Sequence, residues 1–177
     1  MANKSVGVCR DGVACVSKSV LLRESARGVG LCDEWYGGWG DDESDADLVR
    51  RYVRGIDFSV RTGWPDVGLI RSLFDASFLE GCGVYLDCVH DVCLERAVCV
   101  FVGDCDCEVS VVDFGTCTLH VLCKSRLRVC CGLGSRVQMR LHGGSCVTVR
   151  HRGGGRVTCF VDSGCVVRGD VDRLIER

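Results

Sequence analysis

Residues 125–164 read, in blocks of ten, SRLRVCCGLG, SRVQMRLHGG, SCVTVRHRGG and GRVTCFVDSG. Each block begins with a small residue and then has apolar residues at alternate positions, which is the period of a β-strand. Glycine is frequent where the blocks meet, as is usual for tight turns. This stretch therefore predicts short strands that recur about every ten residues.

The same pattern extends toward the N-terminus. Successive units start ten residues apart, with one interval of eight, and a small residue precedes each start by two positions. Alternation places residues i and i+2 on one face of a strand. It predicts inward side chains at Val109, Val111, Leu119, Val121, Leu127, Val129, Val137, Met139, Val147, Val149 and Val157. It predicts outward side chains at Ser110, His120, Arg128, Gln138 and Thr148.

Two architectures fit a ten-residue unit. In a β-solenoid the strands stack in parallel, and two units make a coil of about twenty residues. In an antiparallel meander or sandwich each unit is one arm of a hairpin. Small residues that recur at one register favour the solenoid, and the repeat over 81–168 has neither Asn-Gly nor Asp-Gly, the dipeptides typical of hairpin turns. The solenoid is the favoured architecture, with the meander or sandwich as the alternative.

The chain before residue 80 has a helical period instead. Val13, Val16, Val20 and Leu21 are spaced as on a helix that ends near Gly28. An acidic run at 41–47 supplies the N-cap of an amphipathic helix over 48–56, and a second helix is expected from Pro65 to about 80. The predicted fold is α+β: a helical part over 1–80, a β-repeat over 81–168, and a tail or short helix over 169–177.

Composition excludes several classes of protein. The chain has 177 residues, of which 47% are hydrophobic and 26% charged, and this balance is typical of a globular protein. It contains no run of eighteen apolar residues that would predict a membrane span. No signal peptide is recognisable at the start, so a cytoplasmic location is expected, with no membrane partner.

Sixteen cysteines stand out in a chain of this size. Disulfides need an oxidising compartment, to which nothing in the sequence directs the chain. Zinc sites usually have paired Cys-x-x-Cys spacings, and none occurs here. Most cysteines stand where Val, Ser or Ala would fit the repeat, so we expect small buried apolar side chains. No metal and no cofactor is predicted.

Three segments before the repeat carry a resemblance to a known group of proteins. They are Leu31-Cys-Asp-Glu-Trp35 with Trp39-Gly-Asp-Asp42, then Arg54-Gly-Ile-Asp-Phe58, and then Trp64-Pro-Asp66 followed by Phe74. With the valine-rich repeat that follows, this layout resembles small uncharacterised proteins of gut anaerobic bacteria and of their phages and mobile elements. The resemblance implies the two-part layout and brings no activity or catalytic residue.

Catalytic combinations are weak in this sequence. A nucleophilic cysteine needs a histidine and an orienting acid nearby, and two such sets can be written down: Cys93 with His90 and Asp91, and Cys123 with His120 and Asp113. Among sixteen cysteines and four histidines, such neighbours arise by chance. The glycine-rich segments lack the strand-to-helix context of a phosphate-binding loop. We therefore expect no enzyme and no catalytic residue.

Basic residues are concentrated in the repeat. Between Phe114 and Val161 the sequence has eight basic residues, three histidines and no acidic residue. Some of the arginines recur just before the strand starts, so on a solenoid they are expected to form a ladder, which is an electrostatic footprint for a polyanion. The candidate binding residues are Arg126, Arg128, Arg136, Arg140, Arg150, Arg152 and Arg156, with Lys124 as the eighth basic residue.

Two functions are carried forward. The first is a non-enzymatic structural or interaction protein, an accessory of a phage or mobile element. It is expected to bind an unknown protein partner or to associate with itself through the β-repeat. The alternative is a module that binds a polyanion or nucleic acid through the arginines. The absence of interleaved aromatic residues for base stacking disfavours nucleic acid. A solvated strand face that prevents edge pairing would also explain the charges.

Overall fold

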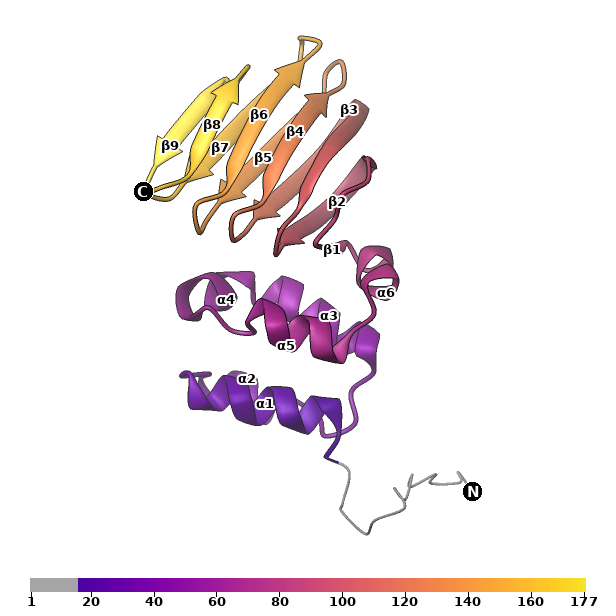
Figure 1. Ribbon diagram of the computed structural model, residues 1–177, viewed down its shortest axis with the longest axis vertical. Coiled ribbons are helices and arrows are strands. Elements are labelled where there is room, and N and C mark those ends of the chain that lie inside the picture. The colour runs from indigo at the N-terminus through magenta and orange to yellow at the C-terminus, as the bar shows by residue number, and fades with distance from the viewer. Residues whose placement is uncertain (1–15) are drawn as a thin grey trace. The chain divides into compact units, whose positions relative to one another are not determined.

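The computed structural model describes residues 16–177, apart from the side chains of residues 96 and 97 (Figure 1). Val13 lies outside this part. So does the start of the chain, where the sequence showed no recognisable signal peptide. The helices are α1 (Lys18–Gly28), α2 (Asp33–Gly37), α3 (Asp45–Arg54), α4 (Ile56–Thr62), α5 (Val67–Leu73) and α6 (Ala76–Gly81). The strands are β1 (Val84–Leu86), β2 (Val92–Val102), β3 (Asp106–Val121), β4 (Arg126–Cys131), β5 (Arg136–Leu141), β6 (Cys146–His151), β7 (Arg156–Val161), β8 (Val166–Gly169) and β9 (Arg173–Glu176).

The chain divides into two compact units, residues 1–48 and 49–177. The described part of the first unit holds α1, α2 and the start of α3. Ser17 caps α1 by accepting a hydrogen bond from the Val20 amide, and the Trp39 indole donates to Ser19 Oγ at 3.0 Å. Trp39 is buried. It fixes the loop after α2 against α1.

Two helical predictions change in detail. The helix expected over 48–56 is α3, which ends at Arg54, and a separate helix, α4, begins at Ile56. Ser44 Oγ accepts a hydrogen bond from the Asp47 amide and so starts α3 within the acidic run, as expected. The single helix predicted from Pro65 is two helices, because Phe74 is extended and Asp75 accepts a hydrogen bond from the Ser77 amide. A short acidic side chain that binds nearby backbone amides favours a new helix start over continuation.

The β-repeat is a parallel β-solenoid, as predicted, with two strands in each coil. Leu127 of β4 pairs with Val147 of β6, and Val137 of β5 pairs with Val157 of β7, so neighbouring strands are twenty residues apart. The first column consists of 92–94, 106–111, β4, β6 and β8. The second column consists of β1, 96–102, 116–121, β5, β7 and β9. Figure 1 shows the strands side by side in this stack.

The interval of eight residues between two predicted units is absent from the structure. Cys107 pairs with Leu127, and Cys117 pairs with Val137, so the twenty-residue register is already uniform there. Both cysteines are buried. The sequence pattern placed them as small residues ahead of a strand, whereas they are the first inward side chains of their strands.

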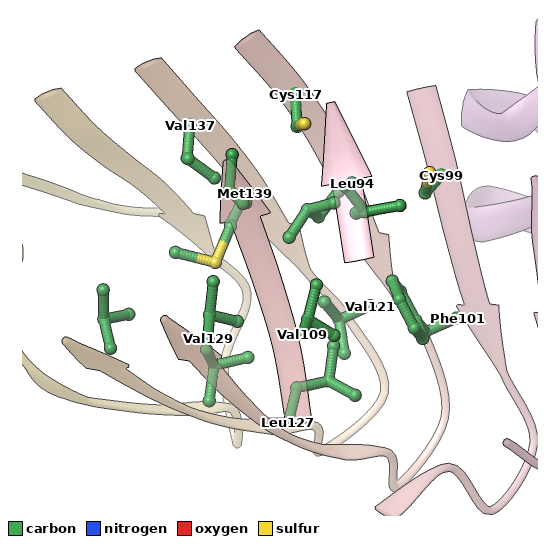
Figure 2. Packing of buried hydrophobic residues seen from close by; sticks show 14 of the residues in the cluster. Leu94, Cys99, Phe101, Val109, Cys117, Val121, Leu127, Val129, Val137 and Met139 are labelled. Atoms are coloured by element: carbon green, nitrogen blue, oxygen red, sulfur yellow. The ribbon is translucent and has the colours of Figure 1, made fainter. Parts of the chain in front are cut away.

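Inward and outward faces follow the predicted alternation. All eleven side chains predicted to point inward are at most 3% exposed, and Figure 2 shows several of them meeting between the two columns, with Phe101 at one end. Ser110, Arg128, Gln138 and Thr148 are half-buried or exposed. His120 is the exception among the outward residues, because it is only 5% exposed.

The helices of the second unit explain the burial of His120. A second apolar cluster joins residues of α3 to α6 with outward-facing Val100, Val102 and Leu122. The outer face of the second column is therefore covered near the ends of its first strands. His120 lies on this covered part of the face, where alternation alone would leave it in solvent.

Small residues line the turns at the same twenty-residue interval. Ser125 and Ser145 are fully buried, and Ser125 Oγ donates to the Gly103 carbonyl at 3.2 Å. Gly155 stacks directly on Ser135, where an added Cβ would stand 2.4 Å from the Ser135 carbonyl oxygen. Stacked coils thus require small side chains at the turns, as the sequence pattern indicated.

The C-terminal segment is a strand, where a tail or short helix was expected over 169–177. In β9, Leu174 pairs with Cys159 and Ile175 pairs with Phe160. The offset here is fifteen residues, because β8 and the following turn are shorter than their counterparts in earlier coils. Backbone pairing with β7 gives this short segment its conformation.

Candidate functional site

The arginines predicted to bind a polyanion fall on two faces of the solenoid. Arg126, Arg128 and Arg150 belong to the first column, and Arg136, Arg140 and Arg156 belong to the second. Arg152 and Lys124 lie in turns. Residues ten apart alternate between the columns, and only residues twenty apart are neighbours. The predicted ladder is therefore two separate groups.

On the first column, acidic residues neutralise part of the positive charge. Arg128 lies 3.1 Å from Asp106, and Arg126 lies 3.9 Å from the same carboxylate. Glu108 accepts a hydrogen bond from the thiol of Cys130 at 3.6 Å. These acidic residues precede Phe114, outside the stretch that had seemed purely basic. The outer face of the first column is of mixed charge.

Arg140 on the second column is also engaged. Its guanidinium lies 3.2 Å from the carboxylate of Asp57 in α4 and 5.8 Å from the Phe160 ring. Its side chain is 28% exposed. Arg177 lies over the same ring at 4.9 Å. Arg140 thus links the solenoid to a helix of its own unit and covers the only aromatic side chain of β7.

Arg136 and Arg156 differ from Arg126, Arg128 and Arg140. They are exposed Cα partners on β5 and β7, and neighbouring strands lie about 4.8 Å apart. Neither guanidinium has a carboxylate partner within residues 16–177. The neighbouring outward positions are uncharged and carry hydroxyl or amide groups: Thr116, Thr118, Gln138 and Thr158.

Arg136, Arg156 and these four neutral polar side chains line a shallow hollow of about 550 Å³ on the second column. Gly134, Gly154 and Gly155 form the part of its rim nearest the turns. We call this surface the basic face. It offers two guanidinium groups, three hydroxyls and one amide, and so it has mainly hydrogen-bond donors for an anion.

A second hollow of about 470 Å³ lies on the first column. Arg150 and Arg152 line it together with Glu108, Asp113 and His151. The two carboxylates offset the two guanidinium groups. The basic face is therefore the stronger of the two candidates for binding an anion.

The structure brings neither suspected catalytic set together. His90 lies 3.0 Å from Glu80 and 3.8 Å from the Cys88 thiol, and Cys93 is exposed on β2. Asp113 accepts a hydrogen bond from the Leu133 amide before the strand segment 116–121, whereas Cys123 follows that segment. Both sets were neighbours in sequence only.

Several cysteines are packed in the solenoid interior. Burial raises the pKa of the thiols of Cys99, Cys107 and Cys159 to about 12, and that of Cys131 to about 11. A thiol with a raised pKa is a poor nucleophile at neutral pH. Over residues 16–177, no three metal-ligating side chains cluster in a way that could hold a metal ion.

Sequence reasoning missed one polar cluster beneath the helices. His120 has no hydrogen-bond partner at Nδ1 in the part of the chain that the structure describes. Burial, reinforced by nearby Arg140 and His142, lowers the pKa of His120 to about 4. His142 in turn binds Asp162 through Nδ1 at 2.5 Å. The twenty-residue spacing of His120, Arg140 and Phe160 is the signal that could have placed them in one row.

None of the helices in residues 16–177 is long and apolar enough to cross a bilayer. Comparison of the chain with protein families, curated proteins and solved structures gave no match.

Proposed function

We propose that the protein is a non-enzymatic interaction module whose basic face binds an acidic segment of a protein partner. The observation that carries this proposal is the adjacent pair Arg136 and Arg156, exposed, in register and without a carboxylate partner within the described chain. A solvated face that only prevents aggregation would need no such arrangement of two unpaired charges beside four neutral polar side chains.

The chemistry of the basic face favours carboxylates on an extended chain over nucleic acid. Parallel strands present their side chains at about 4.8 Å intervals across the stack, and guanidinium groups bind carboxylates through paired hydrogen bonds. Nucleic-acid binding usually adds aromatic side chains on which bases stack. The nearest aromatic group, Phe160, is covered by Arg140 and Arg177.

Direct binding of polyglutamate, measured by fluorescence anisotropy over a salt titration, tests the proposal. The double variant Arg136→Gln/Arg156→Gln should lose most of the binding. The matched control Arg126→Gln/Arg128→Gln removes the same charge from the first column and should retain it. Both variants should keep the wild-type melting temperature, because exposed charges contribute little to stability.

Duplex DNA in the same assay tests the alternative function, a module that binds a polyanion or nucleic acid. Binding to DNA that is tighter than binding to polyglutamate, with a slope of log K against log salt of about −0.9 for each phosphate neutralised, would make the polyanion module the better description. Equal losses in the two double variants would show that net charge, and not the basic face, controls binding, and would contradict the proposal.

A further inference from the structure

The last coil of the solenoid has an unpaired edge. β8 pairs with β6 and β9 pairs with β7, and no other strand within residues 16–177 pairs with either of them. Figure 1 shows both strands at the outer limit of the stack. A strand at the edge of a sheet presents free backbone N–H and C=O groups, which form a template for another strand.

The interior of the solenoid is also open at this end. Leu174 is 50% exposed, although its register partner Cys159 is fully buried. Val167 and Val171 pack against the core and are only partly buried, although Val147, the register partner of Val167, is fully buried. Apolar side chains that would be covered by a further coil are therefore in contact with solvent.

The first coil ends differently. Helix α6 packs against β1, where Leu79 and Val84 are at most 1% exposed. A head-to-tail stack of two solenoids would have to accommodate this helix at the join. Contact between two C-terminal ends avoids it, and a contact of this kind is closed and two-fold symmetric.

Charges on the last coil suit contact with a copy of itself. Residues 166–177 contain three arginines and three acidic residues. Arg168, Arg173 and Glu176 have no ion-pair partner in the described chain. Asp170 and Asp172 lie beside them and accept hydrogen bonds from the His151 and Val157 amides. A two-fold axis reverses the order of these charges in the second copy, so that basic and acidic groups of both copies meet.

We propose that the end surface formed by β8 and β9 docks onto the same surface of a second copy of the chain. The two strands of a coil run in opposite directions, and a two-fold axis across the end therefore pairs each edge strand antiparallel with one of the other copy. The result is a single continuous solenoid, with helix α6 packed against β1 at each of its two ends. Pairing satisfies the free backbone groups and buries the inward side chains Leu174 and Val167.

Light scattering during size-exclusion chromatography of the full chain tests the proposal. The wild type, at 19.2 kDa per chain, should elute at twice that mass at high micromolar concentration. Leu174→Glu places a charge in the interface and should halve the mass while circular dichroism retains the strand signal. Leu133→Glu is the matched control, because Leu133 is an apolar side chain of similar exposure (46%) in a turn away from the end. It should remain dimeric.

Hydrogen exchange of the wild type keeps the test decisive if Leu174→Glu does not fold. The amides of 173–176 that point away from β7 should be protected at high concentration and should lose protection on dilution, while those of β5 stay protected throughout. A wild-type monomer at every concentration would overturn the proposal, even with protected β9 amides, since another part of the same chain would then cover the edge. A dimer that survives Leu174→Glu would place the interface elsewhere and would overturn it equally.

Discussion

At the scale of single residues, alternation along the strands determines which side chains of the solenoid are buried and which face outward. Val147 and Thr148 are sequence neighbours, yet one is fully buried and the other half-buried on the outer face. The sequence predicts this difference because side chains of a strand alternate between faces. It does not predict the burial of His120, which depends on helices that fold over the outer face of the second column.

Replacing Val147 by Ala should destabilise the protein by about 1–3 kcal/mol, since it removes two buried methyl groups and leaves a cavity between the columns. Thr148→Ala, one position along the same strand, should change stability by less than about 0.5 kcal/mol. Urea unfolding followed by circular dichroism measures both. Equal effects of the two substitutions would contradict the assignment of the faces.

His120 should make stability depend on pH. Its folded-state pKa is about 4, against 6.5 for the free side chain, so the unfolded chain binds more protons between these values. The contribution of His120 to the free energy of unfolding is fully present above pH 6.5. It is lost as the pH falls toward 4, and the loss is on the order of 2–3 kcal/mol. In thermal melts between pH 7.5 and 4.5, His120→Gln should therefore show a shallower slope than the wild type.

At the scale of strands and turns, the register between coils decides whether a residue lies in a turn or in a strand, and on which column it lies. A period of ten was visible in the sequence, but cysteines at 107 and 117 could be assigned equally well to a turn or to a strand, because cysteine is both small and apolar. The arginines show the same limit. Their spacing predicted a ladder, whereas pairing between residues twenty apart places Arg136 beside Arg156 and leaves Arg126 on the other column.

Gly155→Ala should destabilise the stack of turns between β5 and β7. The added methyl group would stand 2.4 Å from the Ser135 carbonyl oxygen, so one coil must shift relative to its neighbour. Gly81→Ala is a suitable control, since no atom lies within 4 Å of a Cβ added there. A melting temperature lowered by several degrees for Gly155→Ala alone is expected, and an unchanged value would contradict the close approach of the turns.

At the scale of the whole molecule, the fold class and the two-part order of helices and strands follow from the sequence. The change of period near residue 80 is sharp, and the last helix ends at Gly81 before β1 begins at Val84. The compact units divide elsewhere, after residue 48. Secondary-structure period cannot reveal this division, because α4 to α6 are helical in sequence but share an apolar cluster with the strands.

Cysteine reactivity should report the packing of the whole chain. Under native conditions, exposed Cys32 and Cys93 should react with an alkylating reagent within minutes, while Cys99, Cys107 and Cys159 should react only after unfolding. In denaturant, all sixteen thiols should be modified. Intact-mass spectrometry gives both counts. Fewer than sixteen modified thiols without reductant would reveal a disulfide, and one bound zinc in a native spectrum would contradict the metal-free prediction.

The constant offset of twenty residues between paired strands also makes the length of the solenoid adjustable in fixed steps. Duplicating residues 126–145 would insert one complete coil and lengthen the stack by about 4.8 Å, and every strand would keep the neighbours it needs. Inserting only ten residues would exchange the two columns beyond the insertion, so that Arg156 would move to the face now occupied by Arg150. Evolution or design can therefore change how far the basic face extends without altering its composition, provided that material is added by the whole coil.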